Sequence, residues 1–132
     1  MDSVVLDTNV FVATGFNERS HSAQILKQVQ RGEVRMIWNE ETRDETRYNL
    51  RKIPLLRWDE VADLFNDRDR FTGTLDLNRY DYVDDAADRK FLALAEATGA
   101  ALVSNDNHVL VHAERATVPV LTPSEFLAAR CA

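Results

Sequence analysis

The chain has 132 residues, of which 45% are hydrophobic and 29% charged, and its formal net charge is −6 at pH 7. This composition is that of a globular protein and excludes a disordered chain; the length fits one domain. The negative charge argues against strong nonspecific binding of nucleic acid, which depends on Lys and Arg neutralising phosphates. It does not exclude a nuclease, because acidic metal ligands lower the net charge while the bound metal restores positive charge locally.

Three features predict a cytoplasmic protein without membrane association. No apolar run approaches the roughly 18 residues of a membrane-spanning helix. The start of the chain, Met1-Asp2-Ser3, lacks the basic region of a secretory signal. The single cysteine, Cys131, cannot form an internal disulfide, which agrees with a reducing compartment.

Strands and helices are expected to alternate along the first half of the chain. Asn39 is a suitable cap for one of the helices, which should end before Pro54 because the residue preceding a proline disfavours the helical conformation. The predicted elements are a strand over 3–7, a polar connection containing Gly15, a helix over 20–31 capped by Ser20 or Ser22, a strand over 34–38, and helices over 40–52 and 58–66.

The second half continues this alternation after a segment without a clear pattern. Residues 67–82 are charged and contain one possible strand over 74–77. Thr122, followed three residues later by Glu125, is typical of a capped helix start. The remaining predicted elements are a helix over 85–98 ended by Gly99, a strand over 100–104, a short helix over 107–115, a strand over 118–121 and a last helix from Pro123. Alternation of this kind predicts an α/β fold with a parallel sheet.

Two aspartates follow predicted buried strands. The apolar run 4–6 precedes Asp7, and the run 101–103 leads through two polar residues to Asp106. Ligands of open α/β sheets bind at the carboxyl ends of the strands, so both acids are expected at one edge of the sheet, as in a metal site. A carboxylate buried there must be hydrogen-bonded, paired or bound to metal. Neighbours that could hydrogen-bond it, and that are equally typical of turns and helix caps, are Thr8, Asn9, Ser104 and Asn105.

Further acids lie on two predicted helices. In the helix over 85–98, Asp88 lies one turn before the buried stripe and on the same side, with Asp85 a turn earlier. A helix cap is the simpler explanation for Asp85, but a cap accounts for only one of the two. Glu45 follows Glu41 by four residues in mid-helix, where a solvated charged face and a site residue are both compatible with the spacing.

Two other stripes have simpler explanations than ligand binding. Arg43, Arg47 and Arg51 share a helix face that could contact a phosphate backbone, but pairing with neighbouring acids is favoured. His108 and His112 are four residues apart and could bind zinc. The residues between them lack the glutamate of a zincin helix, so a pair of surface histidines is favoured.

Several segments of the chain share their order and spacing with one known family. The segments are Val-Val-Leu-Asp-Thr-Asn-Val at 4–10, Glu45, Asp-Asp-Ala-Ala-Asp-Arg-Lys-Phe-Leu-Ala-Leu-Ala at 84–95, Leu-Val-Ser-Asn-Asp at 102–106 and Val-Leu-Thr-Pro-Ser-Glu-Phe-Leu at 120–127. In these segments the chain resembles the PIN-domain family, and most closely the toxin components of bacterial type II toxin–antitoxin pairs. The resemblance implies a single PIN-like domain over residues 1–132, with a three-layer α/β/α fold and a central, mostly parallel sheet.

The resemblance also implies an activity and a set of residues. The activity is Mg²⁺- or Mn²⁺-dependent cleavage of single-stranded RNA, and the implied partners are a small antitoxin protein and a second copy of the chain. The catalytic acids would be Asp7, Glu45, Asp88 and Asp106, of which Asp7, Asp88 and Asp106 would bind the metal. Without metal, four clustered carboxylates repel one another, which predicts that at least one has a raised pKa. The supporting residues would be Thr8, Asn9, Asp85 and Ser104.

The chain also departs from this family. His108 stands where many relatives have a second acid, and Ala86 and Ala87 replace a proline and an acid. These departures leave open a different class of function, in which a PIN-like module binds RNA or protein without cutting. A phosphatase of the haloacid dehalogenase type is not favoured, because position 9 is asparagine where that chemistry needs an acid.

Overall fold

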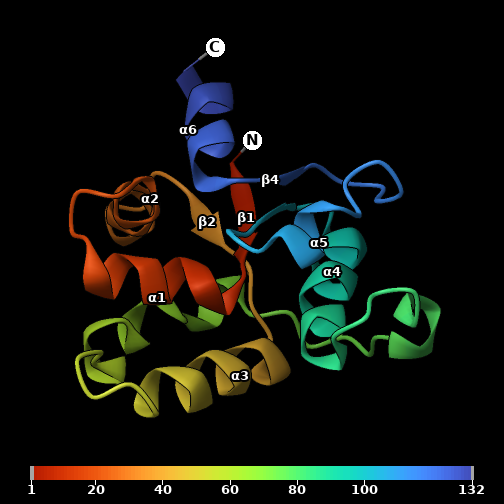
Figure 1. The fold of residues 1–132 in the computed structure, drawn as a ribbon, viewed down its shortest axis with the longest axis horizontal. Helices are drawn as coiled ribbons and strands as arrows, with labels where there is room; N and C mark the ends of the chain where they lie inside the picture. The colour runs from red at the N-terminus through yellow and green to blue at the C-terminus, as the bar shows by residue number, and fades with distance from the viewer. Residues whose placement is uncertain (1, 132) are drawn as a thin grey trace.

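The structure, a computed structural model, describes residues 2–131. Four short strands form a central sheet in the order β2-β1-β3-β4, and every neighbouring pair is parallel (Figure 1). The register places Leu6 beside Val103 and Val103 beside Leu121, so β1 and β3 end side by side. The strands are β1 (Ser3–Leu6), β2 (Arg35–Met36), β3 (Ala101–Val103) and β4 (Val120–Leu121).

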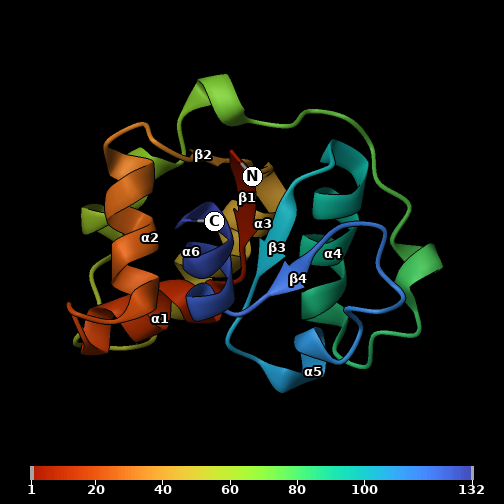
Figure 2. The same ribbon diagram turned by 90° about the horizontal axis from the view of Figure 1, so that it is seen from above.

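Helices cover both faces of the sheet, as the three-layer α/β/α prediction requires. In Figure 2, α1, α2 and α6 lie on one side of the strands, and α4 lies on the other. Among residues 2–131, none of the helices has the length and apolar character needed to span a bilayer. The α-helices are α1 (Thr8–Phe16), α2 (His21–Gln30), α3 (Glu40–Arg51), α4 (Ala86–Thr98), α5 (Asn107–Leu110) and α6 (Pro123–Cys131).

The alternation of side chains along β1 divides the core into two parts. Val4 and Leu6 face α1, α2 and α6, where Ile25 and Phe126 are fully buried. Val5 points to the opposite face and packs with the apolar side of α4, including Phe91. Successive residues of a strand point to opposite faces, so a strand covered on both sides reads as the uninterrupted apolar run that the sequence has here.

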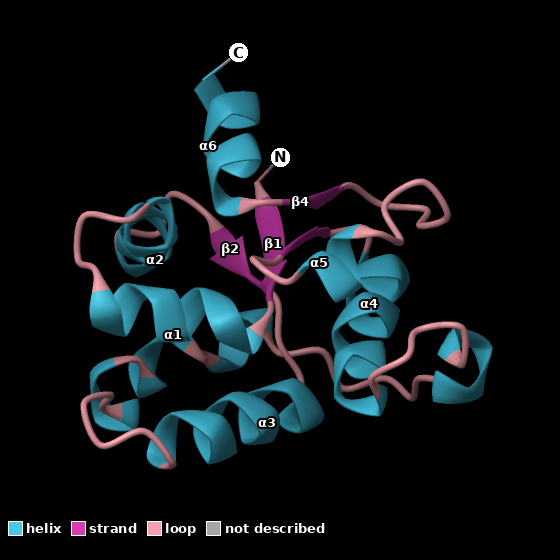
Figure 3. Ribbon diagram, in the orientation of Figure 1, coloured by secondary structure: helices cyan, strands magenta, loops and turns pink. Residues whose placement is uncertain are grey.

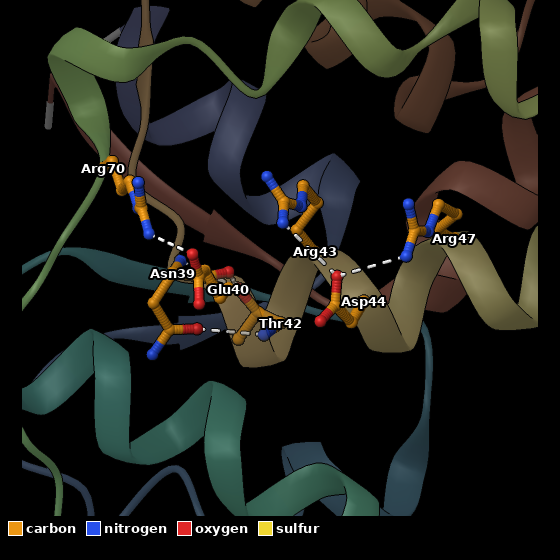
Figure 4. A network of polar contacts seen from close by, with 7 residues as sticks. All are labelled: Asn39, Glu40, Thr42, Arg43, Asp44, Arg47 and Arg70. Carbon is orange, nitrogen blue, oxygen red and sulfur yellow. Dashed lines mark hydrogen bonds and ion pairs between the residues drawn. The ribbon is translucent and has the colours of Figure 1, made fainter.

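Local capping bonds hold the predicted helix ends. Ser20 Oγ accepts a hydrogen bond from the Ala23 amide at 3.1 Å at the start of α2. Asn39 Oδ1 accepts one from the Thr42 amide at 2.9 Å at the start of α3 (Figure 4). The predicted bonds between Thr122 and Glu125 begin α6, and Gly99 ends α4 in the left-handed conformation with φ of 72°. These predictions are confirmed.

The expectation of a polar connection after β1 is wrong, because helix α1 begins immediately after Asp7. This helix has no single apolar stripe: Val10 and Phe11 are buried in the core, and Val12 packs against the same core. Its position depends on contacts with α2 and α3. A methyl group at Gly15 would lie 1.7 Å from Leu56 Cδ2, so the glycine allows this close approach.

The segment between α3 and α4 also differs from prediction. The helix expected over 58–66 is replaced by two 3₁₀ turns, Trp58–Glu60 and Ala62–Leu64, and further 3₁₀ turns cover Asp67–Asp69 and Leu77–Tyr80 (Figure 3). No strand forms over 74–77. Instead, Arg70 forms an isolated parallel β-bridge with Trp38, two residues after β2 ends.

Three other elements are shorter than predicted. The strand expected over 34–38 is reduced to Arg35–Met36, and the strand over 118–121 to Val120–Leu121. Helix α5 ends at Leu110, and residues 111–115 continue as turns. Short strands are sufficient here because each needs to span only the few residues that are covered by helices on both faces.

Candidate active site

The carboxyl ends of β1 and β3 bring Asp7 and Ser104 together. The pairing of Leu6 with Val103 continues by one residue, and the Asp7 amide donates a hydrogen bond to the Val103 carbonyl at 3.0 Å. Ser104 Oγ donates to Asp7 Oδ2 at 2.7 Å and accepts from the Asp106 amide at 2.9 Å. Both Asp7 and Ser104 are buried. One hydroxyl therefore orients the first acid and the backbone that carries the second.

The acids predicted from the sequence line a single cavity of about 320 Å³. It lies beside the ends of β1 and β3 and is bordered by α1, α3 and α4. Asp7 and Asp106 come from the sheet edge, Glu45 from α3, and Asp88 from α4. Thr8, Asn9 and Asp85 also line it, whereas Ser104 acts from behind Asp7. The fold thus brings residues that are far apart in sequence to one place.

Burial and mutual repulsion disfavour the charged forms of two of these acids. Burial raises the pKa of Asp7 to about 6; the hydrogen bond from Ser104 opposes this rise, and the charge of Asp106 adds to it. Burial likewise raises the pKa of Asp88 to about 7, with further contributions from Asp7 and Asp85. The prediction that at least one clustered carboxylate titrates high is in line with these shifts.

Asp88 is also incompletely bonded. Its Oδ2 atom is buried and has no hydrogen-bond partner among the described residues. A buried carboxylate oxygen without a donor is costly, so such atoms are a small minority in folded proteins. Asp88 is one of the residues that line the acidic cavity, so this unpaired oxygen belongs to a side chain of the candidate site.

The negative charge of Glu45 is balanced by a cation, Lys90, that was not predicted as a site residue from the sequence. Lys90 Nζ lies 3.8 Å from Glu45 Oε2, and about one-fifth of each side chain is exposed. Two further residues, Asn49 of α3 and Lys52 at its C-cap, line the cavity together with Glu45. Their spacing of four and seven residues from Glu45 places them on the same helix face and is the signal that could have identified them.

Asp85 and Asp106 have structural roles as well. Asp85 Oδ1 accepts a hydrogen bond from the Ala87 amide at 2.9 Å and caps α4, which is the simpler explanation considered above. Asp106 Oδ1 accepts from the His108 amide at 2.9 Å and lies 3.2 Å from His108 Nδ1. His112 packs instead against Tyr82, so the two histidines do not converge on one ligand position.

The remaining polar residues tie the edge of the cavity together. Thr8 Oγ1 lies 3.1 Å from Thr46 Oγ1, which joins α1 to α3. Asn9 Oδ1 accepts a hydrogen bond from the Asn105 amide at 3.1 Å, which joins α1 to the turn before Asp106. These contacts join α1 to the helix that carries Glu45 and to the turn that leads to Asp106.

A family model of the PIN domain matches residues 3–108 of the chain. The chain belongs to the PIN-domain family. PIN domains are generally nucleases and usually use divalent metal ions. A search of curated proteins gave no match.

Two solved structures share the PIN fold with this chain. FitAB, solved bound to a DNA fragment, matches with a TM-score of 0.59 and 16% identity, covering 91% of this chain and 94% of its own. PAE2754 from Pyrobaculum aerophilum matches with a TM-score of 0.60 and 16% identity, covering 96% of this chain and 88% of its own. At this identity the similarity establishes the fold.

The acids of this PIN domain fit one mode of divalent metal binding. Within residues 2–131, no three Asp, Glu, His or Cys side chains are grouped so that they could hold a metal ion directly. Mg²⁺, however, usually binds through one or two carboxylates and keeps several waters. Asp7 and the unpartnered oxygen of Asp88 suit this mode, because Asp7 is buried, Asp88 is partly buried, and burial disfavours the charged form of both carboxylates.

Proposed function

We propose that this PIN domain is an endoribonuclease that hydrolyses single-stranded RNA with Mg²⁺ or Mn²⁺. The observation that carries this proposal is the convergence of Asp7 and Asp88, from a strand end and a helix, in a cavity with three more acids. Burial, and then the charges of neighbouring acids, raise the pKa values of both side chains. Perturbed acids gathered in a cavity are typical of functional sites.

Each residue has a distinct role in this proposal. Asp7 and Asp88 would hold the cation, and Asp106 would bind it through water. Ser104 keeps Asp7 in one orientation through its hydroxyl. Glu45 completes the cavity, and its pairing with Lys90 limits the repulsion that its charge adds. When bound, the cation supplies positive charge that activates water and stabilises charge developing on the phosphate.

The proposed reaction is hydrolysis, in which water is added across one phosphodiester bond of the RNA. The water oxygen forms a new bond to phosphorus while the bond to the 3′ oxygen breaks, and that oxygen gains a proton. The products therefore carry a 5′-phosphate and a 3′-hydroxyl. Because the 2′-hydroxyl is not the nucleophile, some cleavage of single-stranded DNA is compatible with the same site.

The resemblance to toxin components supports a biological role for this activity. We propose that the chain is the toxin of a toxin–antitoxin pair, acts as a homodimer and is held inactive by a small antitoxin. An acidic cavity favours a basic partner segment, because opposite charges steer association and are complementary across an interface. Co-expression with the product of an adjacent small open reading frame, followed by co-purification, would test the partnership.

The deciding experiment is cleavage of a labelled single-stranded RNA with Mg²⁺, with Mn²⁺ and with EDTA. We expect the wild type to cut only with metal, Asp88→Asn and Asp106→Asn to be inactive, and Asp59→Asn to be as active as the wild type. Asp59 is a suitable control because it is exposed and lies outside the cavity. Cutting that persists in EDTA or in Asp88→Asn preparations would contradict the proposal.

A PIN-fold module that binds RNA or protein without cutting is the second candidate. The observation that favours it is that Asp106 caps α5 and pairs with His108, so that its carboxylate is already engaged. Binding of RNA that stays intact with both metals, across a panel of sequences, would support this alternative.

A further inference from the structure

Helix α3 presents two adjacent faces to solvent, and only one of them belongs to the acidic cavity. Glu45, Asn49 and Lys52 line that cavity. The neighbouring face carries Tyr48 and Arg51 and borders a second cavity of about 420 Å³. Lys52 lines both cavities, so the second adjoins the proposed catalytic centre.

The second face concentrates positive charge in an acidic protein. Four of the 16 Lys and Arg residues of the chain lie between positions 43 and 52, although the net charge is −6. Three of them, Arg47, Arg51 and Lys52, line the second cavity beside one acid, Asp44. A local cluster of cations is the electrostatic feature that attracts phosphates, whatever the net charge of the whole molecule.

Only some of these cations are used inside the protein. Arg43 and Arg47 reach the same carboxylate, Asp44 Oδ1, at 3.5 and 3.7 Å (Figure 4). Arg43 also lies over the Trp38 ring, with Cζ 5.2 Å from its centre. Arg51 is exposed and has no ion-pair partner among residues 2–131. The pairing with acids favoured from sequence accounts for Arg43 and Arg47, but not for Arg51.

Tyr48 lies among these cations and is one of the most exposed large apolar side chains, with 60% of its surface accessible. Lys52 Nζ lies 3.9 Å from the centre of its ring, over one face. More than half of the Tyr48 residue is accessible to solvent. An exposed ring flanked by cations is the arrangement on which single-stranded nucleic acids stack a base while their phosphates meet Lys and Arg.

We propose that Tyr48, Arg51 and Lys52 form a subsite for single-stranded RNA beside the acidic cavity. A base stacks on the open face of the Tyr48 ring, and Arg51 and Lys52 pair with the flanking phosphates. A single strand fits better than a duplex, because its unstacked bases are free to meet an aromatic side chain. This subsite depends on the ribonuclease function proposed above, since it holds the strand that runs into the cavity.

Binding and cleavage are measured separately to test the subsite. Affinity for a fluorescently labelled single-stranded RNA is measured by anisotropy in an Asp88→Asn background with Mg²⁺, and the RNA is checked for integrity afterwards. Tyr48→Ala should weaken binding by about 5- to 150-fold, the range expected for loss of one base–aromatic stack. Tyr48→Phe is the matched control and should bind within about twofold of the parent, because its ring still stacks.

Salt dependence tests the cations. Arg51→Gln should lower the slope of log affinity against log salt by about 0.7, the contribution of one phosphate contact in a single strand. Arg31→Gln removes an exposed arginine at the end of α2, outside both cavities, and should leave the slope unchanged. Melting curves of all variants check that they fold.

Several results would overturn the subsite. One is an affinity for RNA that Tyr48→Ala leaves unchanged. Another is an equal loss of affinity in Tyr48→Ala and Tyr48→Phe. A third is a parent protein that does not bind the RNA. Competition by polyglutamate as effective as competition by RNA would assign the surface to an acidic protein instead. Wild-type cleavage with normal binding by Tyr48→Ala would refute the subsite alone. Tyr48-dependent binding without any cleavage would refute the ribonuclease alone.

Discussion

The environment of Asp88 disfavours its charged form. The residue lies on α4 with an unpartnered buried oxygen and with other acids lining the same cavity. Its pKa rises to about 7, mainly through burial and then through the charges of Asp7 and Asp85. A group of this kind destabilises the folded protein whenever it is ionised and uncompensated.

The stability of the metal-free protein should therefore depend on pH through Asp88. Its pKa is higher folded, about 7, than unfolded, near 3.8, so the folded state binds the proton more tightly. The free energy of unfolding then falls as pH rises from about 4 through 7. In EDTA at pH 8, Asp88→Asn should be more stable than wild type by on the order of 1 kcal/mol, since partial exposure screens the effect.

Thermal melts at pH 5 and pH 8 measure this difference. The advantage of Asp88→Asn should shrink at pH 5, where wild-type Asp88 is largely protonated. Asp59→Asn serves as the control for loss of one surface charge. An advantage of the same size at both pH values would show that titration of Asp88 is not its cause.

Ser104 is the second residue whose role can be measured alone. Its hydroxyl donates to Asp7 and accepts from the Asp106 amide, and its side chain is fully buried. Ser104→Ala leaves both partners without this contact, so we expect a loss of about 1–3 kcal/mol in stability. The pKa of Asp7 should rise further, because the hydrogen bond that opposes its shift is gone. Carboxyl chemical shifts followed through a pH titration would detect the change.

At the scale of elements, α1 is held by packing more than by its own sequence. It begins directly after Asp7 and packs against α2 and α3. Gly15 lies so close to Leu56 that an added Cβ would meet Cδ2 at 1.7 Å. The close approach of Leu56, which is itself buried, helps to keep α1 beside the cavity.

Gly15→Ala should destabilise the protein by about 1–3 kcal/mol, because the new methyl group would displace the buried side chain of Leu56. Leu56→Ala should also destabilise it, because it removes a buried side chain. The double variant should be less destabilised than the sum of the two, because the shortened side chain makes room for the new methyl group. Chemical denaturation of the four proteins gives the coupling energy, and strict additivity would exclude the clash as the cause.

For the whole molecule, the cavity joins the two sides of the sheet. Asp7 follows β1, whereas Asp88 belongs to α4, which packs on one face only. A cation held by both would bind the folded chain and not the unfolded one. Such a ligand stabilises the fold by mass action.

Mn²⁺ should therefore raise the melting temperature of the wild type. At a concentration of 100 times Kd, the expected stabilisation is about 2.7 kcal/mol. Asp88→Asn should lose most of this response, whereas Asp59→Asn should keep it. An equal rise in all three proteins would indicate that the metal binds elsewhere.

Local signals determined a large part of this protein in advance. The caps at Ser20, Asn39 and Thr122 act within one turn of helix, and the apolar run 4–6 is short and uninterrupted, so sequence alone predicted these helices and the buried strand. The same reasoning put Asp7 at the carboxyl end of a strand, because strand direction follows from the parallel alternation.

Only the tertiary structure decided the features that depend on distant residues. The α1 helix carries apolar residues around its circumference, so no periodic stripe identified it, and contacts with α2, α3 and Leu56 settled its position. The pairing of Lys90 with Glu45 joins two helices. The even spacing of the arginines of α3 likewise did not show which of them pair with an acid. Helix and strand signals are local in sequence, whereas burial and charge pairing are properties of the packed molecule.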